Sequence, residues 1–311
     1  MTLALVFPGQ GSQSVGMLAE LAGEFPQVEQ TFAEASAALG YDLWQLVQNG
    51  PESELQLTAV TQPAMLTAGV AVWRAWLAAG GPQPMVMAGH SLGEYSALVC
   101  AGGLPFAQAV QLVRQRGEFM QQAVPVGAGA MAAVLGLDRA AVEAACASAA
   151  TADETVAVAN YNAPPQSVIA GHTAAVQRAS AAAQAAGAKR VVPLPVSAPF
   201  HCALMRPAAA ALTPALEAAG ITPPTVPVIN NVDVATVSDP AAIRDALIRQ
   251  IYSPVRWVEV IEAMAAQGVT RVVECGPGKV LAGLTRRICG ELDSLAVQDP
   301  ASLRQALGTL G

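Results

Sequence analysis

The sequence predicts an α/β protein: a parallel-sheet core with an inserted subdomain of different strand order. Three observations lead to this prediction. Apolar strand-like runs alternate with helical stretches in both halves of the chain, the rhythm changes between residues 126 and 196, and one glycine-flanked serine stands between a buried strand and a helix. Strand–helix alternation implies a parallel sheet covered on both faces. A chain of 311 residues is long enough for one large domain that carries an insert.

The core elements are expected on both sides of the insert. In chain order they are strand 2–7, helix 61–79 with Thr61 as its cap, strand 85–88, helix 92–101, helix 105–122, helix 203–219, strand 226–229, helices 239–250 and 257–267, strand 270–274 and helix 279–289. Further helical stretches precede residue 61. We therefore assign residues 1–125 and 197–311 to the core.

The insert, residues 126–196, has its own predicted order. Its elements are strand 130–135, helix 138–150, strands 155–159 and 166–171, helix 173–186 and strand 188–194. The order β-α-β-β-α-β is the ferredoxin-like arrangement. Prolines at both edges, Pro125 before it and Pro193 and Pro195 after it, suit a subdomain with a small core of its own.

Composition excludes several classes of protein. Hydrophobic residues make up 53% and charged residues 13%, so much of the chain must be buried. The apolar stretch 127–137 is far shorter than the ~20 residues that a membrane helix needs, and residues 1–7 resemble a first strand rather than a signal peptide. The net charge of −7 argues against a nucleic-acid partner. Five cysteines without a C-x-x-C pair predict neither a zinc site nor disulfides, and favour the cytoplasm.

The strongest chemical signal is Gly89-His90-Ser91-Leu92-Gly93, a G-x-S-x-G between a predicted strand and a predicted helix. In that context the glycines allow a tight, strained turn that exposes the serine hydroxyl. The N-terminus of the following helix directs N–H groups toward the reacting oxygen. A chance serine in a glycine-rich turn would need none of this context. We predict that Ser91 is a nucleophile.

A serine nucleophile needs a base, and the chain has three histidines. His90 lies within the turn and is expected to brace it, and His172 ends a strand of the insert. His201 follows the insert in the loop Ser197-Ala198-Pro199-Phe200-His201-Cys202 and is the candidate base by elimination. Cys202 is expected to be a small core residue. No acidic residue stands out as the partner of His201, and a carbonyl is an alternative acceptor for its Nδ1–H.

Several motifs together resemble the acyltransferases of fatty-acid and polyketide synthesis. They are Phe7-Pro8-Gly9-Gln10-Gly11-Ser12-Gln13, Gly89-His90-Ser91-Leu92-Gly93-Glu94, Arg116-Gly117, Phe200-His201 and Gly276-Pro277-Gly278-Lys279. The similarity runs from the first strand to the last helix and best matches the free-standing bacterial malonyl-CoA:acyl carrier protein transacylases. It implies an α/β-hydrolase-like core with a ferredoxin-like insert, which agrees with the pattern of predicted elements.

The resemblance also implies a role for each matching residue. Ser91 is the nucleophile and His201 its base, and Gln250 offers its main-chain carbonyl to His201. The backbone N–H groups of Gln10 and Leu92 form an oxyanion hole. The remaining residues contact the substrate: Arg116 binds the malonyl carboxylate, Phe200 restricts a branched acyl group, and Asn160 and Asn162 lie near the cleft.

The implied activity is transfer of malonyl from malonyl-CoA to the phosphopantetheine thiol of acyl carrier protein, through an ester on Ser91. Neither a metal nor another cofactor is expected, and the partners are the carrier protein and the coenzyme A thioester. Three alternatives share parts of the pattern: a serine esterase or thioesterase, a non-catalytic subunit that binds acyl chains, and the transacylase of a malonate decarboxylase. Arg116 and the missing triad acid count against the first, and intact Ser91 and His201 against the second.

Overall fold

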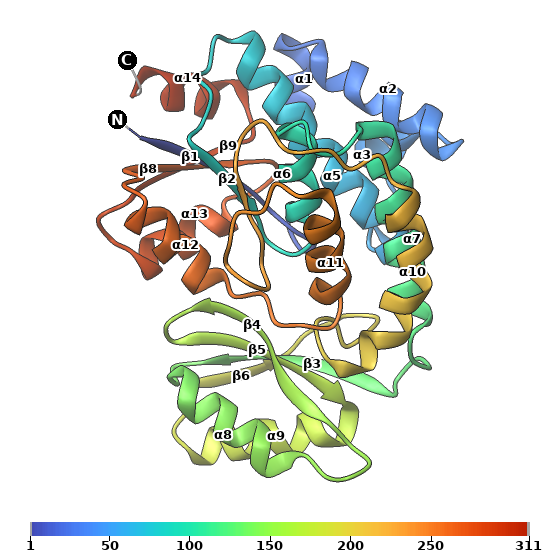
Figure 1. Ribbon diagram of the computed structural model, residues 1–311, viewed down its shortest axis with the longest axis vertical. Helices are drawn as coiled ribbons and strands as arrows, with labels where there is room; N and C mark the ends of the chain where they lie inside the picture. The colour runs from blue at the N-terminus through green and yellow to red at the C-terminus, as the bar shows by residue number, and fades with distance from the viewer. Residues whose placement is uncertain (1, 310–311) are drawn as a thin grey trace.

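The computed structural model describes residues 2–309; residue 1 and residues 310–311, the outermost positions of the predicted core, lie outside the described residues. The core contains a five-stranded sheet of order β7-β2-β1-β8-β9, in which every pairing is parallel. Its strands are β1 (Leu3–Phe7), β2 (Val86–Gly89), β7 (Val228–Ile229), β8 (Arg271–Cys275) and β9 (Asp293–Val297). An α/β protein with a parallel-sheet core, as the sequence predicts, is thereby confirmed (Figure 1).

Alternation along β1 shows that helices cover both faces of this sheet. Leu3, Leu5 and Phe7 belong to one buried cluster, whereas Ala4 and Val6 belong to another. Successive side chains of a strand point to opposite faces, so β1 is buried on both sides. The first face is covered by α5 (Thr58–Ala78) and α6 (Gly93–Cys100). Three more helices, α2 (Gln27–Leu39), α7 (Phe106–Gln122) and α10 (Arg206–Ala218), extend the same apolar cluster outward by packing on other helices. The second face is covered by α12 (Trp257–Ala266) and α13 (Val280–Ile288).

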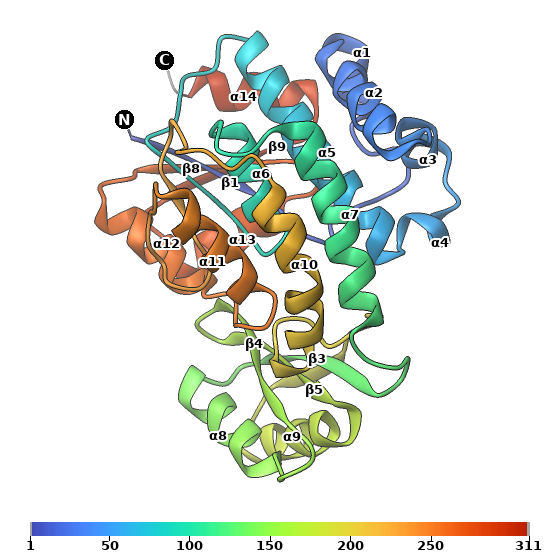
Figure 2. The ribbon, with the colours of Figure 1, turned by 45° about the vertical axis from the view of Figure 1, so that its right-hand side comes forward.

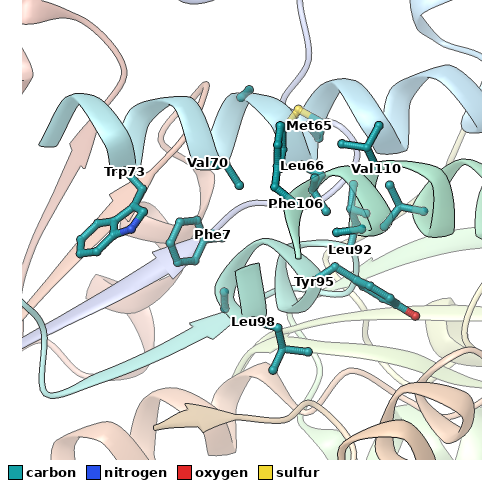
Figure 3. Packing of buried hydrophobic residues seen from close by; sticks show 14 of the residues in the cluster. Phe7, Met65, Leu66, Val70, Trp73, Leu92, Tyr95, Leu98, Phe106 and Val110 are labelled. Carbon is teal, nitrogen blue, oxygen red and sulfur yellow. The ribbon is translucent and has the colours of Figure 1, made fainter. Parts of the chain in front are cut away.

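The larger cluster holds the nucleophile turn against the sheet. Figure 3 shows apolar side chains of α5, α6 and α7 meeting around Phe7 and Leu92. Phe7 is fully buried, and Leu92, in the turn itself, is 1% exposed. Each large apolar side chain buried to this extent contributes about 1.5–3 kcal/mol. Packing on this scale keeps the strained turn in place.

The second sheet is antiparallel, with the order β4-β5-β3-β6, and all its strands lie within residues 126–196. They are β3 (Gly129–Leu135), β4 (Val156–Ala163), β5 (Gln166–His172) and β6 (Arg190–Pro193), interspersed with α8 (Arg139–Ala149) and α9 (Thr173–Ala185). Both helices cover the sheet face that points away from the core (Figures 1 and 2). The chain order β-α-β-β-α-β is the one predicted. The exact domain boundaries stay predictions.

The structure corrects two expectations. The long helix α5 begins at Thr58, so Thr61 is not its cap; the Thr61 hydroxyl instead donates to the carbonyls of Leu55 and Leu57 inside the first turn. Pro63 lies within this helix. The predicted elements also ended at residue 289, but β9 and α14 (Pro300–Gly308) follow and complete the sheet edge.

The remaining elements are helical. They are α1 (Ala19–Glu24), α3 (Leu43–Asn49), α4 (Glu52–Leu55), the 3-10 turn η1 (Ala203–Met205) and α11 (Pro240–Gln250). Within residues 2–309, no helix is long and apolar enough to cross a membrane.

Close contact between β2 and α6 should make Gly89 irreplaceable. A Cβ on Gly89 would lie 1.8 Å from the carbonyl carbon of Gly93, so the backbone would have to move. We predict that Gly89→Ala lowers the free energy of unfolding, measured by urea denaturation, by about 3 kcal/mol. Gly23→Ala is the control, because a Cβ there meets nothing within 4 Å. Equal stability of the two variants would contradict the prediction.

Candidate active site

Ser91 lies in a sharp turn between β2 and α6, at the carboxyl edge of the parallel sheet. Its φ is +52°, in the left-handed region that residues other than glycine rarely adopt. Such strain persists where the surrounding structure enforces it. Gly93 allows the approach, because a Cβ there would lie 2.0 Å from the carbonyl oxygen of Phe7. The geometry is that of the tight turn predicted at residues 89–93, which is called a nucleophile elbow.

Asn231 holds the elbow from behind. Its Oδ1 accepts a hydrogen bond from the Ser91 N–H at 2.7 Å, and its Nδ2 donates to the Gly89 carbonyl at 2.8 Å. Asn231 is fully buried in the loop after β7. The sequence did not indicate Asn231, because a single asparagine in a loop carries no pattern.

His201 contacts the Ser91 hydroxyl, with 2.6 Å between Nε2 and Oγ. Its Nδ1 lies 2.9 Å from the main-chain oxygen of Gln250, the last residue of α11. A carbonyl only accepts hydrogen bonds, so Nδ1 carries the proton and Nε2 is free to accept from Ser91. Burial, together with the Arg116 charge, lowers the pKa of His201 to about 3. The imidazole is therefore neutral over the physiological range.

The other two histidines lie apart from this pair. His90 Nε2 lies 2.8 Å from Asn162 Oδ1, so this contact ties the elbow to β4. His172 accepts a hydrogen bond from the Thr155 N–H within the insert. Cys202 is buried, and burial raises the pKa of its thiol to about 11, which leaves it protonated.

Arg116 reaches the same hydroxyl from α7. Its Nη2 donates to Ser91 Oγ at 3.2 Å and to Gln250 Oε1 at 3.0 Å, while Nη1 donates to Gln62 Oε1 at 2.8 Å. The residue is 2% exposed, and its buried Nε has no hydrogen-bond partner. Burial lowers the pKa of the guanidinium. Arg114, by contrast, pairs with Glu118 on the exposed side of the helix.

A cavity of about 370 Å³ opens onto these groups. Seven of the predicted site residues line it: Gln10, Ser91, Leu92, Arg116, Asn160, Phe200 and His201. The pairing of β4 with β5 shifts between Val158 and Asn160, and Asn160 bridges to Val255 of the core. Gln250 lies behind the cavity wall, and Asn162 contacts His90 instead.

The backbone at Gln10 and Leu92 suits an oxyanion hole. In the described chain, the N–H groups of these two residues donate to no protein acceptor. Both residues line the cavity beside Ser91. Unpaired N–H groups in such a position are the donors that a developing oxyanion requires.

The structure adds contacts that the sequence did not indicate. The Gln250 side chain donates through Nε2 to the Ser91 carbonyl at 3.0 Å and to Glu94 Oε2 at 2.8 Å. Glu94 belongs to the motif that follows Ser91, but its side chain had no expected role. Residues 2–309 bring together no group of three or more His, Cys, Asp or Glu side chains that could hold a metal ion.

A serine in a strand-to-helix turn, paired with a histidine in a parallel-sheet α/β core, is typical of enzymes that use serine as a nucleophile. The chain belongs to the family described as acyl transferase domain, whose model matches residues 4–302. It is an acyltransferase.

Within the acyltransferases, the chain is similar in sequence and in structure to malonyl transacylases. The chain is 60% identical over 304 residues to the malonyl CoA-acyl carrier protein transacylase of Salmonella typhimurium, with 98% of each chain covered. It is 46% identical to the one from Bacillus subtilis, with 99% of this chain and 97% of the relative covered. A crystal structure of an acyl carrier protein S-malonyltransferase from Vibrio cholerae aligns with a TM-score of 0.97 at 58% identity, over 98% of this chain and 100% of that one.

A further solved structure holds a type II polyketide-synthase acyl-carrier protein in complex with its malonyl-transacylase. The matched chain has a TM-score of 0.98 and 56% identity, over 99% of this chain and 100% of that one. The predicted membership of the acyltransferase family is therefore confirmed.

The elbow should depend on Asn231. Asn231→Ala leaves the Ser91 N–H and the Gly89 carbonyl without their partner, and each buried polar group so stranded costs about 1–3 kcal/mol. We expect a loss of about 2–4 kcal/mol in the free energy of unfolding, measured in urea. Asn49→Ala, at an exposed position in α3, is the control and should change stability by less than about 0.5 kcal/mol. Similar losses in both variants would count against this role.

Proposed function

We propose that this acyltransferase moves a malonyl group from malonyl-CoA to the phosphopantetheine thiol of acyl carrier protein and so supplies fatty-acid synthesis. The names of its relatives support this assignment. The observation that carries it is the convergence of His201 and Arg116 on one hydroxyl, that of Ser91. The contact between His201 and Ser91 suits a base and its nucleophile. The position of Arg116 suits binding of an acyl group that ends in a carboxylate.

The first half-reaction forms a malonyl ester on Ser91. Nε2 of His201 takes the hydroxyl proton while Ser91 Oγ attacks the thioester carbonyl carbon. The oxyanion accepts hydrogen bonds from the N–H groups of Gln10 and Leu92. The tetrahedral intermediate collapses, the C–S bond breaks, and the proton on His201 passes to the departing coenzyme A thiolate.

The second half-reaction reverses these steps with a different thiol. His201 takes the proton of the phosphopantetheine thiol, and the sulfur attacks the ester carbonyl. The C–O bond to Ser91 then breaks, and the proton returns to Ser91 Oγ. No metal or further cofactor takes part in this proposal, since the imidazole and the two N–H groups supply the proton transfer and the charge stabilisation.

Arg116 is the proposed carboxylate ligand. Its guanidinium is buried at the cavity, its Nε has no hydrogen-bond partner, and its other nitrogens donate to the neutral oxygens of Gln62, Ser91 and Gln250. A buried cation without an anion is costly, and a planar guanidinium matches a carboxylate with two parallel hydrogen bonds. Phe200, which lines the same cavity, is the proposed barrier to a branched acyl chain. Asn160 and Asn162 take supporting positions at the cavity wall and behind the elbow.

The serine and the base are tested by single-turnover release of coenzyme A from malonyl-CoA. Ser91→Ala should abolish acyl-enzyme formation with the fold intact, because the change removes one oxygen atom. His201→Ala should slow acylation by about 10²–10⁴-fold, the range for loss of a general base. Intact-mass measurement should show the added malonyl mass in wild type and its absence in Ser91→Ala. Acylation of His201→Ala at the wild-type rate would refute the assignment of the base.

Arg116 should decide which acyl group is accepted. Arg116→Ala should reduce the transition-state stabilisation of malonyl transfer by several kcal/mol, as when one partner of a buried charge pair is removed. Acetyl transfer should survive, because acetyl leaves no charge unpaired, and Arg116→Lys should recover malonyl transfer only in part. The measurement is the ratio of kcat/KM for malonyl-CoA to that for acetyl-CoA. Arg114→Ala, on the exposed side of α7, is the control, and its ratio should match wild type.

An unchanged ratio in Arg116→Ala would mean that this arginine is structural. Release of free malonate as fast as coenzyme A, with carrier protein present, would instead identify a thioesterase.

A further inference from the structure

The buried Arg116 side chain has an anion near it, one amide group away. Gln250 Oε1 accepts from Arg116 Nη2 at 3.0 Å, and Nε2 of the same amide donates to Glu94 Oε2 at 2.8 Å. Guanidinium, amide and carboxylate thus form a continuous chain inside the protein. Hydrogen bonds in such a chain polarise one another.

Glu94 is itself buried, 2% exposed, in the first turn of α6. Its Oε2 accepts a second hydrogen bond, from the Asn231 N–H at 2.9 Å. The Asn231 side chain in turn accepts from the Ser91 N–H. Glu94 therefore contacts both residues that hold the catalytic pair, Gln250 on one side and Asn231 on the other. A buried carboxylate is costly to retain unless a nearby charge or hydrogen bonds stabilise it.

We propose that ionised Glu94 is the counter-charge of this active site, a positioning residue that acts through Gln250 and takes the place of the acid missing from the serine–histidine pair. It does not touch the substrate. The inference rests on the proposed roles of Ser91 and His201. It gives Glu94 a role, whereas the matched motifs assign none to its side chain.

The need for a counter-charge follows from the contacts of one atom. Ser91 Oγ lies 2.6 Å from His201 Nε2 and 3.2 Å from Arg116 Nη2. When His201 takes the serine proton, an imidazolium forms beside a guanidinium in a buried site, where like charges repel strongly. The negative charge of Glu94 offsets that repulsion and favours proton transfer. Each pKa unit by which it raises the basicity of His201 corresponds to about a tenfold gain in the proton-transfer equilibrium.

The charge state of Glu94 depends on its surroundings. Burial raises the pKa of its carboxyl to about 7, and the hydrogen bonds from Gln250 and Asn231 and the Arg116 charge oppose the rise. Glu94 therefore gains or loses its proton within the pH range in which the enzyme can be assayed. Protonation would leave Oε2 able to accept both hydrogen bonds but would remove the counter-charge.

Few other charged groups act on Glu94. Asp233, in the loop after β7, tends to raise its pKa but is paired with Arg249 of α11. His90, after β2, has its pKa lowered by burial. On α5 the charged residue is Arg74, which pairs with Glu34 of α2, and β1 and β2 carry no charged residue. Arg116 is thus the charge that Glu94 most directly balances.

The test uses the whole protein and a neutral reagent, phenylmethylsulfonyl fluoride. Ser91 Oγ bonds to sulfur, the S–F bond breaks, fluoride leaves, and the serine proton passes to His201. The reagent carries no carboxylate and no coenzyme A, so its rate reports the serine–histidine pair with Arg116 unneutralised. The rate of modification is followed by intact mass between about pH 5.5 and 8.5, a range centred near the Glu94 pKa of about 7.

The decisive variant is Glu94→Gln, which keeps an oxygen to accept both hydrogen bonds but carries no charge. Wild type should react faster as the pH rises through about 7, while Glu94→Gln should stay flat and react about 10–100-fold more slowly than wild type at the upper end. Glu274→Gln is the matched control. Glu274 is also buried and its pKa is also raised to about 7 by burial, but it accepts from the Ala282 N–H of α13. This variant should follow wild type.

A rise of unchanged size and midpoint in Glu94→Gln would overturn the inference and assign the titration to another group. If Glu94→Gln does not fold, Glu94→Asp decides, because a shorter carboxylate in the same place must move the midpoint; an unmoved midpoint overturns the inference equally. Absence of any Ser91 modification in wild type would refute the nucleophile, and with it the proposed function. A pH-independent rate in wild type refutes the role of Glu94 alone.

Discussion

The burial of one guanidinium sets the conditions for the rest of the site. Arg116 is almost fully enclosed, yet three of its contacts are to neutral oxygens, those of Gln62, Ser91 and Gln250. Removing a cation from water without an adjacent anion is expensive, so the surroundings must supply many hydrogen bonds. Those acceptors come from α5, the elbow and α11, which are far apart in the sequence and meet at the carboxyl edge of the sheet. In α/β folds with a parallel sheet, that edge is where ligands bind.

The insert contributes to this edge without belonging to the core sheet. Asn162 on β4 holds His90, and Asn160 lines the cavity near a shift in strand pairing. The chain then returns to the core at the loop that carries His201, whose φ of +59° is as unusual as that of Ser91. Two strained residues in direct contact require a rigid frame, which the packed helices and the Asn231 bracket supply.

Residues within one motif could be predicted from the sequence, whereas residues brought together by the tertiary fold could not. The elbow was recognisable because strand, glycines, serine and helix are contiguous, and His201 followed by elimination among three histidines. Asn231 and the side chains of Gln62 and Gln250 act through contacts across more than fifty residues, which leave no local pattern. The same holds for the fold. The predicted helices lie close to their observed positions, but β9, with Asp293 and Ser294 in a short strand, lacks the apolar run of the other core strands.

The neutral acceptor on His201 is consistent with the charge of the proposed substrate. A carboxylate bonded directly to Nδ1, as in an ordinary serine–histidine–acid triad, would stand close to a cavity that must admit an anionic acyl group. The carbonyl of Gln250 orients the imidazole through the same hydrogen bond but carries no net charge. Glu94 lies on the far side of the Gln250 amide from Arg116, and Arg116 lines the cavity whereas Glu94 does not. A site that places its cation at the cavity and its anion away from it can favour proton transfer to His201 and still attract a carboxylate.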